Sequence, residues 1–314
     1  MMLRNRLLIL SVVAGMSCTT VVGHAQFTAD NPDAACSHEN LKHVSNVDHY
    51  VFESYRNEHN GTACLLVLRN REIILRYTNG NDGEYLIGQH PDPKRYWDVP
   101  EIPDGTDITG EGYPNMIVSS YSGGAHCCLS TYIFRLEPTF KLIATLDAQD
   151  SWPAYFADLD HNHHYFWFAR DWTFAYWPSS FAGSPSAPVI LQFETNRKGG
   201  KYHLALQKMH RPAPSSNEWA KEKNDARAMF ASGGLDISSG PTLWNSILNL
   251  IYSGHSELAW KFFSQTWPSK LSGKDEWLGN FCSVLMSSPY WPDLKSSVQN
   301  APPACANAKA PSAK

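Results

Sequence analysis

The stretch that decides the fold is DITGEGYPN, which runs from Asp107 to Asn115. Asp107, Thr109, Glu111 and Asn115 fall at positions 1, 3, 5 and 9 of this run, and Gly112 falls at position 6. In a tight loop, alternate side chains can turn their oxygens toward one point, and a glycine lets the backbone fold around that point. A hard cation such as Ca²⁺ takes several oxygen ligands of this kind. The pattern therefore predicts a calcium-binding loop.

A second oxygen-rich run, DLDHNHHYF, begins 51 residues after the first. Asp158, Asp160 and Asn162 are candidate metal ligands at positions 1, 3 and 5, while His163 replaces the glycine and Phe166 replaces the last oxygen ligand. Because these ligands are lost, we expect this run to keep the shape of the loop mainly as a structural turn. For both runs the alternative is a polar β-turn in which Asp and Asn side chains accept backbone amides.

Both loops precede a strand of β-branched or aromatic residues, and they resemble the D-x-D/N-x-D-G-x-x-D calcium loops of FG-GAP repeats. Such repeats occur in integrin α-subunits and in bacterial VCBS-type proteins, where each loop joins two strands of a propeller blade. The runs DITGEGYPNMIVSSYSGGAHCC and DLDHNHHYFWFARDWTFAYW, with the later YSGHSELAWKFFSQTWP, also resemble a group of exported bacterial proteins with FG-GAP-like loops and a helical C-terminal segment. This resemblance covers residues 100–290 and implies no established activity.

The part of the chain from about residue 47 to 208 has the pattern of short antiparallel strands separated by turns. Ten segments have strand character: HYVFESYR, TACLLVLRN, REIILRYTN, PNMIVSSYS, LSTYIFRLE, FKLIATLD, HYFWFARD, FAYWPSS, APVILQFE and KYHLALQKM. A spacing of 51 residues between the two loops fits one four-stranded unit, so this length holds about three units. A closed propeller usually needs at least four blades. We therefore expect a partial or irregular FG-GAP-like propeller.

After the sequence RPAP at residues 211–214 the apolar spacing changes to a helical period. Helices are expected from Ser216 to Gly233, from Pro241 to Gly254, from Ser256 to Pro268 and from Asp275 to Met286, and the middle two form an αα-hairpin. The fold class is therefore α+β, with a β-rich domain at 26–211, a helical domain packed on it at 212–300, and a flexible tail at 301–314.

The first 25 residues have the layout of a secretory signal peptide. Arg4 and Arg6 precede an apolar run that is too short to span a bilayer, and Ala25 ends a small-residue cleavage site. Cleavage would change the net charge from −4 to about −6, and no cluster of Lys or Arg follows. The sequence therefore predicts an exported protein, periplasmic or extracellular, with no membrane span in the mature chain and no nucleic-acid partner.

An even number of cysteines in an exported chain favours disulfides. Outside the signal peptide there are six: Cys36, Cys64, Cys127, Cys128, Cys282 and Cys305. Proximity in the sequence suggests the pairs Cys36–Cys64 and Cys282–Cys305. Three interpretations remain open for Cys127 and Cys128 in the segment SGGAHCC. They are a vicinal disulfide, separate thiols or bonds to distant cysteines, and a metal site that includes His126.

The segment from Trp152 to Phe181 contains twelve aromatic residues. Core packing explains most of them, and the alternative is a rim that stacks on sugar rings or peptide side chains, with Trp172, Tyr176 and Trp177 as the platform. The sequence thus favours a non-enzymatic exported module that binds an unknown protein or carbohydrate. Two alternatives are a secreted hydrolase that acts on polysaccharide or envelope material, and an assembly protein that docks a partner through its helical hairpin.

Overall fold

The computed structural model describes residues 35–80, 83–91, 99–124, 128–196, 199–232 and 241–309. The strands in this part of the chain form three antiparallel sheets of four strands each. The strand orders are β1-β2-β3-β4, β5-β6-β7-β8 and β12-β11-β10-β9, so each sheet is a meander of strands that are consecutive in the sequence. The first strand of every sheet, β1, β5 or β9, is therefore an edge strand.

Each of the three sheets is made of four strands that are four to ten residues long. The first sheet contains β1 (Leu41–Val47), β2 (Tyr50–Arg56), β3 (Ala63–Arg69) and β4 (Glu72–Asn79). The second contains β5 (Glu84–Ile87), β6 (Asn115–Tyr121), β7 (Leu129–Arg135) and β8 (Lys141–Gln149). The third contains β9 (Tyr155–Asp158), β10 (Tyr165–Asp171), β11 (Ala187–Asn196) and β12 (Gly199–Leu204).

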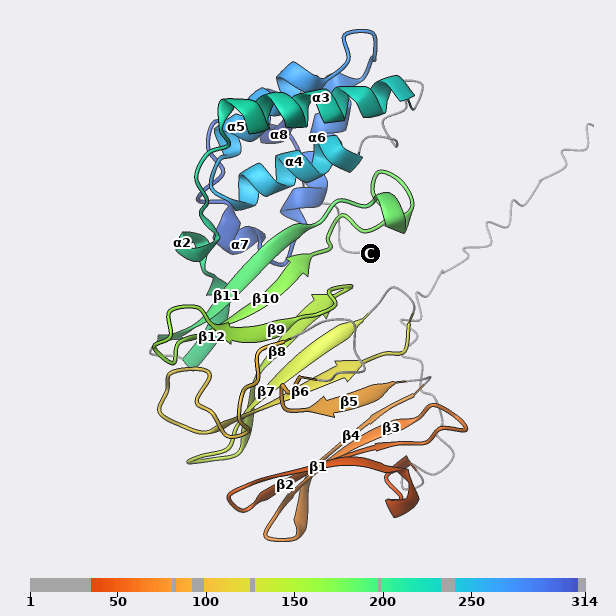
Figure 1. Ribbon diagram of the computed structural model, residues 1–314, viewed down its shortest axis with the longest axis vertical. Helices are drawn as coiled ribbons and strands as arrows, with labels where there is room; N and C mark the ends of the chain where they lie inside the picture. Colours follow the sequence, from red (N-terminus) through yellow and green to blue (C-terminus); the bar gives the residue numbers. More distant parts are fainter. Residues whose placement is uncertain are drawn as a thin grey trace, which may run out of the picture.

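The helices follow the third sheet in the sequence. They are α2 (Leu206–Met209), α3 (Ser216–Ser232), α4 (Pro241–Tyr252), α5 (Ser256–Thr266), α6 (Lys274–Met286), α7 (Trp291–Leu294) and α8 (Pro303–Ala306), in addition to the short 3₁₀ helices η1 (His38–Asn40) and η2 (Phe181–Gly183). In Figure 1 the three sheets lie one above another in chain order, and the helices cover the far side of the third sheet.

The middle sheet is covered on both faces, which explains why β6 is almost continuously buried. Met116 and Val118 point to one face and pack with Phe52 of the first sheet. Ile117 points to the other face and belongs to the core cluster that includes Trp167 of the third sheet. Successive side chains of β6 thus enter two different hydrophobic cores, one on each face of the middle sheet.

The second of these cores continues from the third sheet into the helices. The ring of Trp244 in α4 stacks on Phe281 in α6, with centroids 5.2 Å apart. Leu191 of β11 belongs to the same cluster of buried residues. At the other end of this layer, Asp293 of α7 accepts the backbone N–H of Leu204 at 2.9 Å. The helices therefore share an apolar core with the sheet.

The predicted α+β class, with antiparallel sheets followed by helices, is confirmed. The four long helices begin and end within a few residues of the predicted positions. Ser215 caps the N-terminus of α3, because the Ser215 hydroxyl accepts the Glu218 N–H and the Glu218 carboxylate accepts the Ser215 N–H. This reciprocal pair is a capping box.

The strand predictions differ from the structure at FAYWPSS and at β1, β5 and β9. FAYWPSS was predicted as a strand, but residues 174–180 form turns between β10 and β11. In contrast, β1, β5 and β9 were not predicted. β5 and β9 are only four residues long, and β1 is largely exposed, so neither length nor apolar alternation marks them. All three are the first strands of their sheets.

Several sequence predictions concern residues that lie outside the described part of the chain. These include the signal peptide at residues 1–25 and Cys127. Within the described residues, the predicted tail contains α8, which the Cys282–Cys305 disulfide ties to α6. No helix in the described ranges has both the length and the apolar character that a membrane crossing requires.

Candidate functional site

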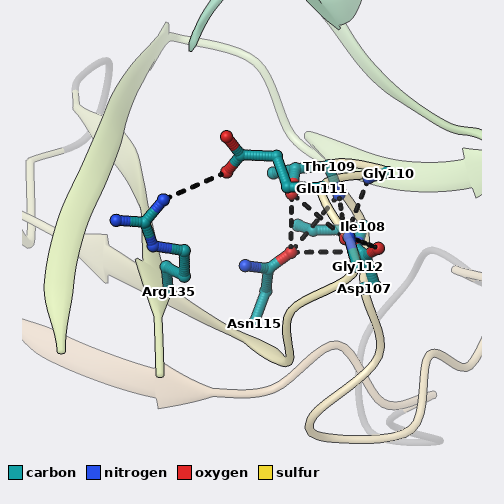
Figure 2. A network of polar contacts seen from close by, with 8 residues as sticks. All are labelled: Asp107, Ile108, Thr109, Gly110, Glu111, Gly112, Asn115 and Arg135. Atoms are coloured by element: carbon teal, nitrogen blue, oxygen red, sulfur yellow. Dashed lines mark hydrogen bonds and ion pairs between the residues drawn. The ribbon is translucent and has the colours of Figure 1, made fainter. Parts of the chain in front are cut away.

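The first oxygen-rich loop connects β5 to β6 and is closed by hydrogen bonds to Asp107 (Figure 2). One carboxylate oxygen of Asp107 accepts the backbone N–H of Gly110 at 2.9 Å and that of Thr109 at 3.2 Å. The other oxygen accepts the N–H of Gly112 at 2.6 Å. The carboxylate thus accepts hydrogen bonds from backbone N–H groups that have no partner strand in this tight turn.

Thr109 links Asp107 and Asn115, because its hydroxyl lies 3.1 Å from Oδ1 of Asp107 and 3.3 Å from Oδ1 of Asn115, whereas Glu111 points away from both (Figure 2). The side-chain oxygen of Asn115, which is 2% exposed, accepts the N–H of Ile108 at 2.9 Å. Glu111 instead faces Arg135 of β7, and the closest N···O distance of this pair is 3.7 Å. Figure 2 shows the Glu111 carboxylate directed away from Asp107 and toward Arg135.

The second loop connects β9 to β10 and repeats the same backbone arrangement. Asp158 accepts the N–H of Asn162 at 3.2 Å and that of His163 at 2.8 Å. Desolvation of the Asp158 carboxyl is outweighed by these backbone hydrogen bonds and that of Asp160, so the pKa of Asp158 lies below its usual value. The Asp160 carboxylate binds Nζ of Lys208 in α2 at 2.6 Å.

The two loops therefore occupy matching corners, because each joins the first and second strands of its sheet. In both, the leading aspartate accepts the N–H of the fifth residue after it, Gly112 or His163. Those residues have φ of 82° and 63°, and Gly110 and His161, three residues after each aspartate, have φ of 73° and 52°. The left-handed positions of one loop are repeated in the other although only one loop has glycines there.

The cation prediction is not tested by this geometry. Within the described ranges, no group of three or more His, Cys, Asp or Glu side chains is arranged to hold a metal ion. The loop oxygens of Asp107 and Asn115 are occupied by N–H donors instead. This matches the polar-turn alternative for the shape of the loops.

The two predicted disulfides are present. Cys36 is bonded to Cys64 of β3, and Cys282 of α6 is bonded to Cys305 of α8. Cys128 is also disulfide-bonded. Because Cys127 and His126 lie outside the described residues, the vicinal bond stays a prediction.

Two of the three predicted platform residues lie against the same ring. Trp172 stacks on Phe181 with centroids 5.1 Å apart, and Tyr176, which is 63% exposed, lies 5.6 Å from that ring. Trp177 is half-buried and contacts Trp244 of the helical layer, with ring centroids 4.9 Å apart. Ligand binding by these three residues stays a prediction.

A cleft of about 580 Å³ lies apart from the predicted site residues, along β1, β5 and β9, the strands that were not predicted from the sequence. Its lining comes from β1 and β2 of the first sheet, from residues 84–91 on and after β5, and from residues 152–156 on and before β9. Ser119 of β6 and Thr131 of β7 line it from the middle sheet. Its volume is in the range of small-ligand sites. None of the predicted metal-binding or aromatic-platform residues belongs to its lining.

The mouth of the cleft carries charges that pair with one another. Nζ of Lys42 is 2.6 Å from the carboxylate of Glu58. The guanidinium of Arg56 is 3.8 Å from the carboxylate of Glu84. The mouth therefore has both signs of charge close together and no excess of one sign among these four residues.

The walls of the cleft combine aromatic rings with hydroxyl groups. Trp152 and Tyr155 are half-buried, whereas Tyr55 and Tyr85 are each 7% exposed. Burial is the largest cause that raises the pKa of Tyr55 and Tyr85 well above the usual phenol value. Both phenols therefore keep their protons at physiological pH.

Gln89 holds the two sides of the cleft together. Its side-chain oxygen accepts the N–H of Phe156 at 2.6 Å, and its side-chain N–H₂ donates to the Phe156 carbonyl and to the Pro100 carbonyl, both at 2.8 Å. The amide thus pairs with the edge of β9 as a neighbouring strand would. This contact joins the second and third sheets at their first strands.

Buried polar atoms on the lining residues include Oγ1 of Thr131 and Nε1 of Trp167, which make no hydrogen bond within the described part of the chain. Thr131 is 2% exposed and Trp167 is fully buried. Both atoms are closed to solvent, so a molecule in the open cleft does not reach them.

No protein-family model, no curated protein and no solved structure matches the chain. Sequence reasoning missed the cleft, and the one signal present was the cluster of turn residues and prolines at 89–106, which separates β5 from β6.

Proposed function

We propose that the protein is an exported, non-enzymatic binding module whose ligand occupies the cleft along β1, β5 and β9. The observation that carries this proposal is the cleft itself, with a volume of about 580 Å³ and walls of aromatic and hydroxyl-bearing residues. Ligand sites are typically concave, mostly apolar and supplied with a few polar groups of this kind.

The proposed scaffold is an open, FG-GAP-like arrangement of three blades. The three consecutive meanders and the matching loops at Asp107 and Asp158 support it. In such an arrangement the first strands face the centre, and the missing blades leave the centre open. The helices would then cover the far side of the last blade.

Export is supported by the chemistry of the cysteines. The two disulfides, Cys36–Cys64 and Cys282–Cys305, are consistent with an oxidising compartment. We propose the periplasm or the extracellular medium as that compartment.

Two alternative functions have less support. A hydrolase would be favoured by a cleft that joins Asp107 or Asp158 to Trp172, and these residues are not in the lining of the cleft. Docking through the helical hairpin would be favoured by an exposed groove along α5. Phe262 of α5 is fully buried, and Trp219 of α3 packs on it with ring centroids 5.4 Å apart.

Filling the cleft tests the proposed function without knowledge of the ligand. Ser119 points into the cleft from the middle of β6, so Ser119→Trp should occupy part of its volume. In an NMR screen of a small-molecule fragment library, we expect fragments that bind the wild type and lose binding in Ser119→Trp. Ser264→Trp adds the same bulk at an exposed position outside the cleft and should leave these fragments bound. Equal binding to the wild type and to Ser119→Trp would show that the cleft is not the site.

Calcium binding at Asp107–Asn115 stays a prediction that a melting experiment can test. A ligand that prefers the native state stabilises it, by about 1.4 kcal/mol at ten times its dissociation constant. We expect millimolar Ca²⁺ to raise the Tm of the wild type and of Asp158→Ala, but not that of Asp107→Ala. No rise for the wild type would remove the calcium site from the proposal and leave the cleft unaffected.

A further inference from the structure

We propose that the cleft binds a neutral saccharide, held between aromatic rings and hydroxyl groups along β5 and β9. This inference rests on the proposed function and names its ligand class. It excludes a charged ligand such as a phosphate ester or an acidic sugar. It also favours a sugar over a peptide segment.

The charge pattern of the cleft is the first argument. Lys42 is paired with Glu58, and Arg56 lies near Glu84, so a charged ligand would have to break an existing pair to gain its own. An anion at Lys42 would also approach the Glu58 carboxylate, which lies 2.6 Å from that ammonium group. Repulsion between like charges makes that arrangement unfavourable. A neutral ligand leaves these pairs intact.

The lining groups supply the second argument. Ser119 carries a half-buried hydroxyl, and Ser54, Thr131, Tyr55 and Tyr85 carry buried ones, of which that of Tyr55 already donates to the Glu53 carboxylate. A hydroxyl can donate one hydrogen bond and accept others, so it is complementary to the hydroxyls of a sugar. An extended peptide would instead need a regular ladder of backbone partners. At the edge of β9 the backbone of Phe156 is already paired with Gln89.

The third argument concerns the aromatic side chains of the cleft. The half-buried rings of Trp152 and Tyr155 provide apolar faces for the C–H side of a sugar ring. The combination of apolar faces with hydroxyl partners is what a neutral saccharide requires.

The test is a titration followed by intrinsic tryptophan fluorescence and checked by calorimetry. The probes are three neutral trisaccharides (cellotriose, maltotriose and triacetylchitotriose), the anionic trimer of galacturonic acid, and the uncharged peptide trialanine with an acetylated N-terminus and an amidated C-terminus. We expect at least one neutral trisaccharide to bind, with affinity at least tenfold higher than that of the charged trimer or the peptide. Binding of the charged trimer or trialanine with equal or higher affinity would overturn the ligand class but leave the cleft as a binding site.

Two variants locate the binding. Trp152→Ala removes an aromatic wall, and we expect it to weaken binding of the trisaccharide about tenfold or more. Tyr176→Ala removes a more exposed aromatic ring outside the cleft and should leave the affinity unchanged. Should Trp152→Ala fail to fold, Ser119→Trp provides an independent loss of binding. If no probe binds while fragments still bind in the cleft, the saccharide inference fails and the proposed function stands. If neither fragments nor probes bind, both fail.

Discussion

Replacing Asp171 with alanine is expected to lower the free energy of unfolding by roughly 3–4 kcal/mol. Asp171 ends β10, is 2% exposed, and accepts hydrogen bonds from the hydroxyls of Tyr252 and Ser288. Its other oxygen accepts the N–H of Thr173 at 2.8 Å. Tyr252 belongs to α4 and Ser288 follows α6, so one carboxylate connects the third sheet to two parts of the helical layer.

The size of this effect follows from what alanine leaves behind. Burial and the neighbouring Asp171 carboxylate raise the pKa of Tyr252 well above its usual value, so the phenol remains a donor. Without Asp171, the Tyr252 and Ser288 hydroxyls would lose their acceptor in a site that water does not reach. A buried polar group without a partner costs roughly 1–3 kcal/mol.

Urea denaturation of three variants measures this contribution. Tyr252→Phe removes a single donor and should cost about 1 kcal/mol, less than Asp171→Ala. Glu72→Ala, at an exposed position on β4, should change the free energy of unfolding by less than about 0.5 kcal/mol. A loss for Asp171→Ala no larger than that for Glu72→Ala would show that the buried network does not attach the helices to the sheet.

The second large effect is expected from Gln89→Ala, which should lower the free energy of unfolding by roughly 2–3 kcal/mol. The variant loses the hydrogen bonds to Phe156 and Pro100, and it leaves the backbone N–H and carbonyl of the fully buried Phe156 unpaired. Because Gln89 lines the cleft, its loss should also weaken fragment binding.

The isosteric variant Gln89→Glu separates shape from hydrogen bonding. It keeps the acceptor for the Phe156 N–H but replaces the donor with an oxygen that faces the Phe156 and Pro100 carbonyls. We therefore expect Gln89→Glu to be destabilised at neutral pH by at least as much as Gln89→Ala. Gln299→Ala, at an exposed position, is the matched control and should be nearly neutral. A wild-type unfolding curve for Gln89→Glu would contradict the role of Gln89 as a clamp.

Local signals in the sequence were sufficient to predict the helices and most of the longer strands. Leu243, Ile247 and Leu250 recur at the helical period and are buried in α4, because one face of that helix covers the third sheet. The pairs Cys36–Cys64 and Cys282–Cys305 were also predicted, since their partners are close in sequence. The two oxygen-rich loops indicated equivalent corners, and their hydrogen bonds to Asp107 and Asp158 match.

The cleft could not be predicted because its walls come from elements far apart in the sequence. Lys42, Leu86 and Tyr155 belong to the first strands of three different sheets. Each of these strands has only one neighbour in its sheet, and two of them are too short to show alternation. FAYWPSS was wrongly predicted as a strand because its local signal was strong, whereas the missed strands had weak signals. Its aromatic residues have high strand propensity, but Phe174 and Trp177 pack into the helical layer from a turn.

The most direct test of the account is to locate bound fragments by amide chemical shifts in isotope-labelled protein. We propose that the ligand site lies along β1, β5 and β9, the edge strands that come first in the three sheets. The largest chemical-shift changes are therefore expected at residues 84–91 and 152–156, with smaller changes at Ser119 and Thr131. Shifts centred on Tyr176 and Phe181, or on the helices α4 and α5, would contradict it.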